Sequence, residues 1–576
     1  MTSAAGARFE VDVATLVKAT LALGLLSVFA LPILKFIIRP YTHPLRVLDG
    51  PKSKHWYWGS WDKATYVNGQ FERNFNETIK EYGPVFSLVG LGRKPSLAVC
   101  DHRAVSKILL QTPYSRHARA NGILRRHVGR GLLTEQGPTH RRQRKIAHPA
   151  FTANAVFDMA PVFREKTDRL VTRLHNHIKT LADPSAATHG TKLNIALDLN
   201  CVALDIIGSA GFGYEFNALL NTSQESTELE RAFASCMHMI STGTLYAALR
   251  VAFGEPIVTI GRLLRVKEQA ELDKARAVVE SVSADLVRRA KKNAEEGDSS
   301  SARDVLSLMV RANVAEDVKP TQRLSDLELQ QMVPVFMIAG HETTSTATSW
   351  ACYSMIQGER GLELQTRLRE ELNSPQAAGW RDDAHVLDAL PYLDSFVRET
   401  LRFHCPVRQM GREAPFDDVL PLSRPVTLKD GTKTDKIRVK KGDICFLSIV
   451  WLNTCEELWG PDGREFKPER WLPEDHPHYE RGLQMDSSVK ELKGVFSHLL
   501  TFGGGPNACI GLRLSIMEMK YILSALISNF DLLPPNLPGE DAVKIMSVTQ
   551  IVAHPMIEGE WEKGLAMPVR IRARSA

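Results

Sequence analysis

The sequence predicts a mainly α-helical protein with small β-sheets, preceded by a transmembrane helix at its N-terminus. From Asp101 to about Leu401, most of the chain has apolar residues at the spacing of amphipathic helices. Strand-like segments are few and short, and residues 13–38 form an almost wholly apolar run. The chain has 576 residues, of which 44% are hydrophobic, so it can bury a large core.

The apolar run Val13–Ile38 is longer than the roughly 20 residues that are needed to cross a bilayer. A cleaved signal peptide is the alternative, but the residues before the run include Glu10 and Asp12 instead of a basic start. Basic residues lie at the end of the run and shortly after it: Lys35, Arg39, Arg46, Lys52 and Lys54. By the positive-inside rule, these charges place the rest of the chain on the cytosolic side. We therefore expect residues 1–39 to be an uncleaved membrane anchor.

Short alternating segments predict strands at the edges of the helical part. Pro84–Gly90 and Ser96–Asp101 are predicted to pair with each other. Ile437–Val439 and Ile444–Ile449 flank a Lys-Gly-Asp turn and predict a β-hairpin. Pro568–Arg572 is predicted to form a final short strand. Helices therefore dominate the prediction.

The overall composition excludes several classes of protein. A net charge of +6 from 72 basic and 66 acidic residues is too mild to indicate a nucleic-acid-binding protein. The 8 cysteines are scattered without close pairs, which favours a reducing compartment over a disulfide framework. Their spacing matches no zinc motif.

One cysteine, Cys509, stands at the end of a glycine-rich loop that begins at Phe502. A predicted helix, Leu512 to about Phe530, starts just after it. A thiolate at a helix N-terminus is expected to have a lowered pKa and suits a metal-ligating sulfur. A single thiolate without a second ligand nearby fits an iron held mainly by a porphyrin. The alternative is a buried structural cysteine after a Gly-Pro turn.

The longest predicted helix begins at a capping box formed by Ser325 and Glu328. Its pattern continues to about Gln357, where Gly358 can stop it, and it would be about 50 Å long at about 1.5 Å per residue. Pro334 lies inside it and predicts a kink. Ala-Gly-His-Glu-Thr-Thr, residues 339–344, stands near its middle. On its own this pattern also fits a core helix with a small-residue crossing.

These two motifs resemble those of the cytochrome P-450 family of haem-thiolate monooxygenases. Phe502, Gly505, Cys509 and Gly511 match its haem-binding loop, and residues 339–344 resemble its oxygen-activation motif. The resemblance covers roughly Gly50 to the C-terminus. It implies haem b (iron protoporphyrin IX) with Cys509 as the axial thiolate.

The resemblance also implies the division of the chain and the roles of the oxygen motif. The anchor would be followed by a proline-containing hinge at residues 40–55 and a single catalytic domain at residues 56–576. Ala339 and Gly340 would leave room for dioxygen and substrate. Glu342 would relay protons and Thr343 would donate a hydrogen bond to dioxygen, so both are the expected catalytic residues. His341 is expected to pack behind the site, with a direct proton role as the alternative.

Glu399-x-x-Arg402 matches a further family motif, and Pro468-Glu469-Arg470 matches the segment that accompanies it. Residues three apart share a helix face, so Glu399 and Arg402 can form an ion pair. The resemblance implies that Glu399, Arg402 and Arg470 form a buried structural triad. The alternative, a solvated surface pair, would be the ordinary reading of Glu-x-x-Arg alone.

Two departures from the family pattern concern the haem propionates. Asn507 stands where the family usually has an arginine, two residues before the cysteine. His140 replaces the tryptophan of the family's Trp-x-x-x-Arg, while Arg144 keeps the arginine. An imidazole can donate a hydrogen bond as an indole does. Arg412 is a further candidate to replace the missing arginine.

The run of residues 141–145, Arg-Arg-Gln-Arg-Lys, is either a solvated basic face or a docking patch for an acidic electron donor. The resemblance implies NADPH–cytochrome P-450 reductase as that donor. It places substrate contacts in four largely apolar segments: Tyr114–Leu133, Phe233–Leu249, Phe336–Ala339 and Cys405–Met410.

A lipophilic small-molecule substrate follows from these segments. We expect a microsomal, fungal-type enzyme of secondary metabolism in the endoplasmic reticulum membrane, with a terpenoid as one possible substrate class. The alternatives are a haem-thiolate isomerase or dehydratase that needs no reductase, and a non-catalytic haem-binding membrane protein. The Glu342–Thr343 pair argues against both.

Overall fold

The computed structural model describes residues 38, 41–52, 71–90, 94–111, 114–181, 186–220, 231–232, 246, 255–296, 303–316, 318–480, 487–537, 539–549 and 551–574. Residues 13–37 of the predicted anchor lie outside this described part, as does nearly all of Phe233–Leu249. Within it, one helix, Ile195–Phe212 (α10), is long and apolar enough to cross a membrane, and 83% of that stretch is buried inside the protein. It is therefore placed as a core helix.

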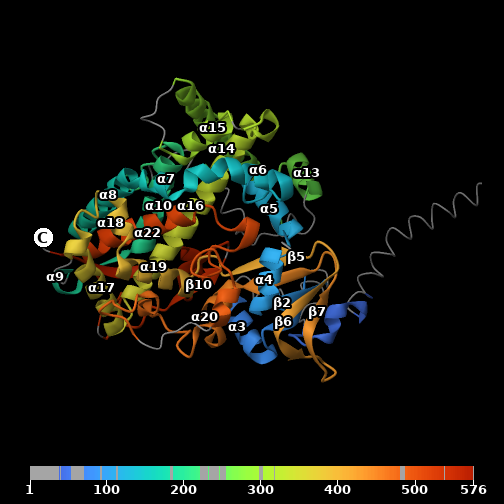
Figure 1. Ribbon diagram of the computed structural model, residues 1–576. Helices are drawn as coiled ribbons and strands as arrows, with labels where there is room; N and C mark the ends of the chain where they lie inside the picture. The colour runs from blue at the N-terminus through green and yellow to red at the C-terminus, as the bar shows by residue number, and fades with distance from the viewer. Residues whose placement is uncertain are drawn as a thin grey trace, which may run out of the picture.

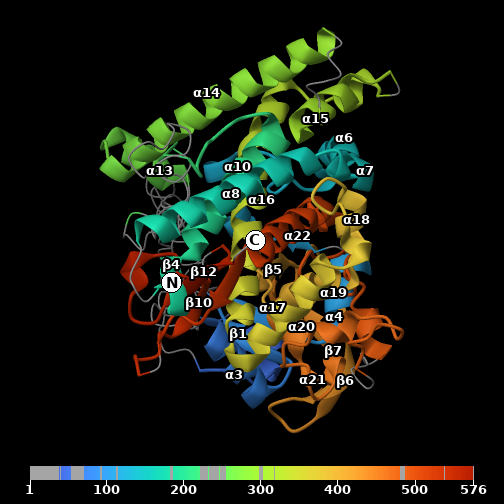
Figure 2. The same ribbon diagram turned by 90° about the vertical axis from the view of Figure 1, so that its left-hand side faces the viewer.

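The described chain is mainly helical with small sheets, as predicted. The helices gather on one side of the molecule and most strands on the other, while α14 lies across the helical end (Figures 1 and 2). The longer helices are α3 (Phe71–Tyr82), α5 (Ala118–Val128), α6 (Gly137–Ala147), α8 (Ala160–Thr180), α10, α13 (Glu255–Leu263), α14 (Lys267–Glu295), α15 (Val305–Val314), α16 (Asp326–Met355), α17 (Gly358–Leu372), α19 (Pro391–Phe403) and α22 (Leu512–Asn529). Short ones are α4 (His102–Ser106), α7 (Ala153–Phe157), α9 (Ala186–His189), α18 (Ala384–Asp388), α20 (Ile449–Thr454) and α21 (Glu456–Trp459).

Helix α16 runs through the middle of the helical part and packs most extensively against α10. The predicted capping box is confirmed, because the Ser325 hydroxyl accepts from the Glu328 N–H and the Glu328 carboxylate accepts from the Ser325 N–H. Pro334 lies inside the helix, which continues through it. The predicted stop is slightly late: α16 ends at Met355, and Gly358 instead begins α17 with a positive φ of 57°.

The strands form four small sheets. The largest has the order β1 (Val85–Val89), β2 (Pro95–Val99), β8 (Ile444–Ser448), β5 (Gln409–Glu413) and β3 (Ser115–Arg116). The others are β4 (Thr191–Asn194), β12 (Pro568–Ala573) and β9 (Phe530–Leu533); β6 (Asp418–Thr427) with β7 (Lys433–Val439); and β10 (Ile545–Thr549) with β11 (Ala553–Ile557). The predicted pairing of β1 with β2 and the final strand β12 are confirmed.

The predicted hairpin between Ile437–Val439 and Ile444–Ile449 is wrong. Both strands exist, but β7 pairs with β6, whereas β8 pairs with β2 and β5. The turn between them is held from outside, because Gly442 donates to the Ala414 carbonyl at 2.8 Å and Ala414 donates to the Asp443 carbonyl at 2.9 Å. These bonds turn the chain into a second sheet instead of back along β7.

Part of the predicted hinge is packed on the catalytic domain. Leu45 and Leu48 are each 1% exposed and join the apolar core beside the large sheet. The His43 imidazole lies 3.1 Å from the Asp443 carboxylate, and both side chains are buried. Residues 43–50 are therefore fixed to the domain and do not act as a free linker.

Candidate functional site

Two glycines determine the backbone conformation of the glycine-rich loop, and that conformation determines the position of Cys509. Gly503 and Gly505 have φ values of 70° and 65°, and a Cβ on Gly505 would lie 2.3 Å from the Leu109 carbonyl oxygen. The Cys509 N–H donates to the Phe502 carbonyl at 2.8 Å, and α22 begins three residues later as predicted. The backbone conformation of this loop thus requires glycine at positions 503 and 505.

Cys509 is accessible to solvent, but the surrounding protein still excludes enough water to raise the pKa of its thiol. The Gly511 N–H and the Arg144 charge act in the opposite direction and lower it. Desolvation is the larger of these effects, so the pKa of this thiol is raised and not lowered, contrary to the expectation for a cysteine at a helix N-terminus. A bound cation at the sulfur would supply the missing stabilisation of a thiolate.

Four cationic or imidazole side chains gather beside the loop. His140 and Arg144 come from α6, and the Arg144 guanidinium donates to the Ala508 carbonyl at 2.6 Å, directly before the cysteine. Arg116 on β3 and Arg412 on β5 are direct partners across the sheet. Burial, together with the charges of Arg116, Arg144 and Arg141, lowers the pKa of His140 to about 4. His140 is therefore neutral at physiological pH.

The two sheet arginines are short of negative charge. Burial lowers the pKa of Arg116 to about 10, and burial with the Arg116 charge lowers the pKa of Arg412 to about 10. The Nη1 atom of Arg116 is buried and has no hydrogen-bond partner among the described residues. Buried cations are normally paired, so this cluster fits a ligand that brings anionic groups. The two propionates of a haem would be such groups.

Sequence reasoning missed Arg116. It belongs to no motif, and its only significance is its place opposite Arg412 in the β-ladder, which the sequence does not show. Asn507, which stands in place of the family arginine, is half-buried in a 3₁₀ turn at Gly505–Asn507. Arg116 and Arg412 together offer the charge that Asn507 lacks.

The middle of α16 presents an accessible face. Ala339 is exposed and Thr343 half-buried, whereas the residues just before them, such as Met337, are buried. The Thr343 hydroxyl donates to the Ala339 carbonyl at 2.6 Å. A Cβ on Gly340 would lie 2.7 Å from the Ile207 side chain of α10, so this glycine is required by helix packing. Of the two small residues Ala339 and Gly340, only Ala339 is thus placed to leave room for a ligand.

Burial shifts the pKa values of both titratable residues of this motif, His341 and Glu342. Burial raises the pKa of Glu342 to about 7, so this carboxyl group exchanges protons near neutral pH. His341 is 7% exposed, and burial, followed by the nearby His554, lowers its pKa to about 4. His341 is therefore a neutral imidazole packed against the interior.

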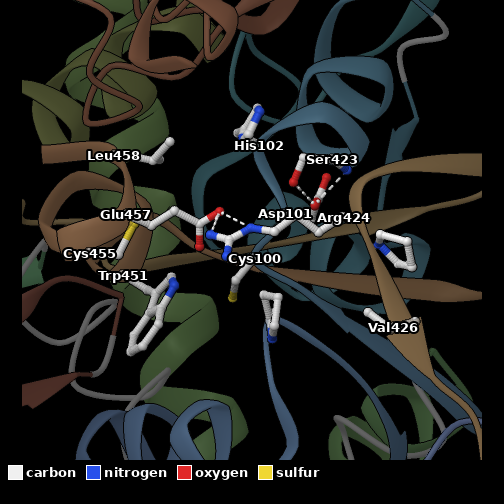
Figure 3. Close-up of a pocket in the computed structure, with 12 residues that line it drawn as sticks. Cys100, Asp101, His102, Ser423, Arg424, Val426, Trp451, Cys455, Glu457 and Leu458 are labelled. Carbon is white, nitrogen blue, oxygen red and sulfur yellow. Dashed lines mark hydrogen bonds and ion pairs between the residues drawn. The ribbon is translucent and has the colours of Figure 1, made fainter. Parts of the chain in front are cut away.

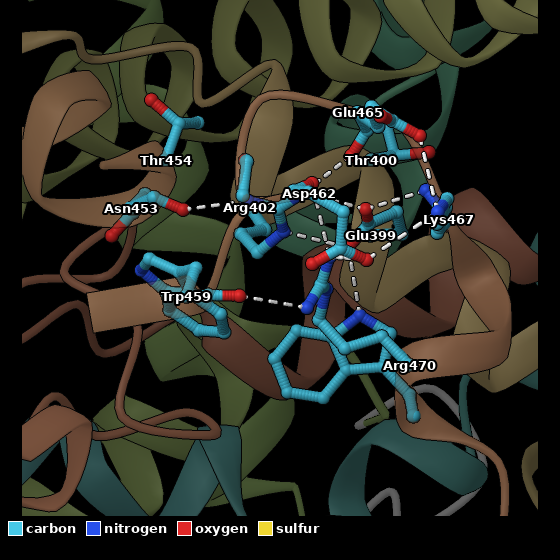
Figure 4. Close-up of polar contacts among 12 residues, drawn as sticks. Glu399, Thr400, Arg402, Asn453, Thr454, Trp459, Asp462, Glu465, Lys467 and Arg470 are labelled. Carbon is cyan, nitrogen blue, oxygen red and sulfur yellow. Dashed lines mark hydrogen bonds and ion pairs between the residues drawn. The ribbon is translucent and has the colours of Figure 1, made fainter. Parts of the chain in front are cut away.

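Glu399 and Arg402 form a two-bonded ion pair in which both side chains are 0% exposed (Figure 4). Arg402 Nε and Nη2 lie 2.8 and 2.7 Å from the two carboxylate oxygens. Three more N–H groups of Arg402 bind the carbonyls of Asn453, Gly463 and Glu465. The pair therefore ties α19 to the segment that leads toward the cysteine loop.

Arg470 does not complete the predicted triad. Its guanidinium lies 2.9 Å from the Asp462 carboxylate and donates to the Trp459 carbonyl (Figure 4). The Glu399 carboxylate instead accepts two further hydrogen bonds, from the indole N–H of Trp471 at 2.9 Å and from the backbone N–H of Lys467 at 2.7 Å. Because the short turn at 468–471 places successive side chains in different directions, the residue after Arg470 reaches Glu399.

The neighbouring Glu469 is a second buried charge centre that sequence reasoning did not identify. Its carboxylate is 0% exposed and pairs with Arg360 at 2.6 Å and Arg367 at 2.5 Å, both from α17. The Tyr392 hydroxyl donates to it at 3.2 Å. This network holds α17 and α19 together on the side of the short turn at Pro468–Trp471.

A cavity of about 210 Å³ lies elsewhere, between α4, β6 and α20 (Figure 3). Cys100, Trp451 and Cys455 line it, and the ion pair of Arg424 with Glu457 crosses it. None of the predicted site residues lines this cavity. It is thus separate from the Cys509 loop and the accessible face of α16.

Comparison with known proteins agrees with this geometry. The family profile described as Cytochrome P450 matches residues 49–555. The chain is 34% identical to Cytochrome P450 monooxygenase 205 of Postia placenta, over 97% of this chain and 98% of the relative. It is 30% identical to Cytochrome P450 monooxygenase claQ of Ampulloclitocybe clavipes, over 93% and 94%. Proteins of this family are oxidoreductases that bind haem b through a cysteine thiolate. With Cys509 in the matching loop, the chain belongs to the cytochrome P450 family.

Proposed function

We propose that this protein is a monooxygenase that hydroxylates a lipophilic small molecule, with dioxygen and with electrons from NADPH–cytochrome P-450 reductase. The observation that carries the proposal is the middle of α16, where an accessible small residue, a hydroxyl and a carboxyl group with a pKa near neutral stand together. When bound, haem with a thiolate ligand supplies dioxygen activation and favours O–O cleavage. An isomerase would have little use for this proton-carrying pair.

Each residue of the site has a role in this proposal. Arg144, Arg116 and Arg412 bind the propionates with positive charge that no acidic side chain of the described residues neutralises, and the neutral His140 adds a hydrogen-bond donor. Thr343 turns its hydroxyl from the Ala339 carbonyl toward the reacting oxygen. Glu342 delivers protons to that oxygen from the protein interior. A carboxyl group with a pKa near the working pH is the best compromise between holding and releasing a proton.

The lipophilic substrate is supported by the apolar residues of two of the segments that are expected to contact it. Phe336 and Ile338 precede Ala339 on α16 and are 7% and 4% exposed. Val407 and Met410 are half-buried and pack on the second apolar core. A secondary metabolite such as a terpenoid would fit such a lining. The proposed anchor at residues 1–39 would place the domain on the cytosolic face of the endoplasmic reticulum membrane, where such substrates dissolve.

The docking surface for the reductase is smaller than the basic run suggests. Arg142 forms an ion pair with Glu328, and Arg144 turns inward to Ala508. Arg141 and Lys145 are the exposed basic residues of α6 that remain. We assign these two to contact with the acidic donor, so their charge should affect the rate of reduction and leave haem content unchanged.

The test is a product screen. Microsomes that contain the protein and a reductase are supplied with NADPH and a panel of terpenes, sterols, fatty acids and aromatics. We expect an oxygenated product, NADPH dependence, and the red-shifted Soret band of a thiolate-ligated haem in the reduced carbon monoxide complex. Cys509→Ala should lose both band and product. A rearranged product formed without reductase would contradict the proposal, and so would a band that persists in Cys509→Ala.

A further inference from the structure

The hairpin of β10 and β11 is fastened to the C-terminal half of α16. The indole N–H of Trp350 donates to the Ala553 carbonyl at 2.8 Å. The Ala553 N–H donates to the Pro406 carbonyl at 2.9 Å, on the segment that follows α19. The Nδ1 atom of His554 lies 3.4 Å from the Thr346 hydroxyl. These three contacts fix where the His554 ring lies.

That place is the end of the accessible face of α16. Thr343 and Thr346 are three residues apart and share one face of the helix. This face is accessible at Ala339 and Thr343 but only 1% exposed at Thr346, which the His554 ring contacts. His554 is itself half-buried, between the buried residues Ala553 and Pro555. Its ring also lies close enough to His341 to lower the pKa of that residue.

The hydrogen bonds of the helix decide which nitrogen of His554 carries the proton. The carbonyl of Glu342 already accepts the helical N–H of Thr346 and the Ser345 hydroxyl, the latter at 3.2 Å. A carbonyl oxygen has two lone pairs, so it has none for the Thr346 hydroxyl. Most buried hydroxyls are hydrogen-bonded, and the His554 ring is the partner that the Thr346 hydroxyl has among the described residues. Thr346 therefore donates to Nδ1, which leaves the proton of the neutral ring on Nε2.

Most other hydroxyls of this stretch bind within the helix. Those of Thr343, Thr348 and Ser349 each donate to the carbonyl four residues earlier, and that of Ser345 donates to the carbonyl three residues earlier, whereas the buried Thr344 hydroxyl has no hydrogen-bond partner among the described residues. Thr346 thus differs in giving its proton to another element. Nε2 of His554 has no hydrogen-bond partner among the described residues, so its N–H is available to a ligand.

We propose that the Nε2–H of His554 donates a hydrogen bond to an oxygen acceptor on the substrate, so that the enzyme selects lipophilic molecules that carry a carbonyl or hydroxyl group over the corresponding hydrocarbons. This inference rests on the proposed monooxygenase function and narrows its substrate class. Burial keeps the pKa of His554 near 4, so the ring is neutral and offers a donor without a positive charge. A neutral donor recognises an uncharged carbonyl or hydroxyl oxygen and gives no charge-based preference for carboxylates.

The selectivity arises because a hydrocarbon would leave this donor unpaired once the site is closed around it. A site that is built to hydrogen-bond a polar group disfavours the analogue that lacks it, because the buried donor is then left unpaired. One such neutral hydrogen bond corresponds to about a tenfold difference in affinity at 25 °C. The oxygen acceptor also orients the molecule, since the bond fixes one end of it beside Thr346.

The test measures binding, separately from turnover. The haem-loaded full chain is titrated with matched pairs, limonene with carvone and valencene with nootkatone, and the substrate-induced Soret shift gives each Kd. We expect the ketone of at least one pair to bind about tenfold more tightly than its hydrocarbon. His554→Phe should abolish this preference, and His554→Gln, which keeps an N–H donor, should retain most of it. Thr346→Val removes the hydroxyl that fixes the proton of His554 on Nε2, so it should reduce the preference for the ketone.

Haem content, read from the carbon monoxide complex of each variant, separates loss of the donor from loss of the fold. Equal affinity for both members of every pair in the unchanged protein, including no binding of either, overturns the inference. A preference that persists in His554→Phe overturns it as well. Neither result affects the monooxygenase proposal, because the wider product screen tests that proposal by oxygenated product and NADPH dependence.

Discussion

Replacing Arg402 with methionine should be among the most destabilising single changes in this chain. The substitution leaves Glu399, which is 0% exposed, without its cationic partner. Breaking a buried pair in this way costs about 3–5 kcal/mol. It also strands three carbonyls that Arg402 binds at 2.6–2.9 Å, at a cost of about 1–3 kcal/mol each if they stay dry. The sum is comparable to the whole free energy of unfolding of a typical protein, which is about 5–15 kcal/mol.

The assay is thermal unfolding followed by circular dichroism, with haem retention in parallel. At an unfolding entropy of about 2 cal/mol/K per residue, a domain of this size loses about 1 °C in Tm per kcal/mol. We expect Arg402→Met to lower Tm by about 5 °C or more, or to prevent accumulation of folded protein.

Arg470→Met is the matched control, because it also removes a buried arginine of the same region. Its partner Asp462 is 15% exposed and keeps Lys467 at 3.5 Å, so the stranded charge is still compensated. The loss should be clearly smaller. Replacing Glu399 and Arg402 together by methionine should recover part of the loss, since no charge then remains unpaired. A Tm for Arg402→Met within about 1 °C of the unchanged protein, or equal to that of Arg470→Met, would refute the reasoning.

Three other predictions concern the site. Thr343→Ala should keep haem and substrate binding but divert reducing equivalents to hydrogen peroxide, measured as product per NADPH consumed; a fully coupled variant would show that this hydroxyl has no catalytic role. As a proton donor, Glu342 is active in its protonated form, so turnover should fall as pH rises through about 7, and Glu342→Gln should lose this dependence. An unchanged pH profile in Glu342→Gln would assign the titration to another group. Arg412→Met and His140→Ala should weaken haem retention after gel filtration, whereas Asn507→Ala should not; equal haem content in all three would exclude the proposed propionate contacts.

The sequence predicted well those features that local residue patterns determine. The capping box at Ser325 and the helix after Cys509 depend on residues within a few positions of each other, so their spacing is sufficient evidence. What it could not predict depends on contacts between distant segments. Arg116 has meaning only through its cross-strand partner Arg412, which is almost 300 positions away and shows no pattern of its own.

The wrong strand pairing has the same origin. A Lys-Gly-Asp turn between two apolar segments is the ordinary signal of a hairpin, but Ala414 binds this turn from another element. Arg470 is a finer example: the motif placed it correctly in the buried region, and a shift of one residue in a short turn decided which side chain reaches Glu399. Such a choice depends on backbone geometry that residue types alone do not specify.

The packing of residues 43–50 on the large sheet matters for anyone who shortens this protein to make it easier to purify. A truncation at the sequence-based boundary, before residue 56, would remove Leu45 and Leu48 from the core and leave Asp443 buried without His43. A protein that begins at Thr42 keeps all three contacts while losing the apolar run. A buried histidine thus sets the start of the usable catalytic fragment, thirteen positions before the predicted boundary at residue 56.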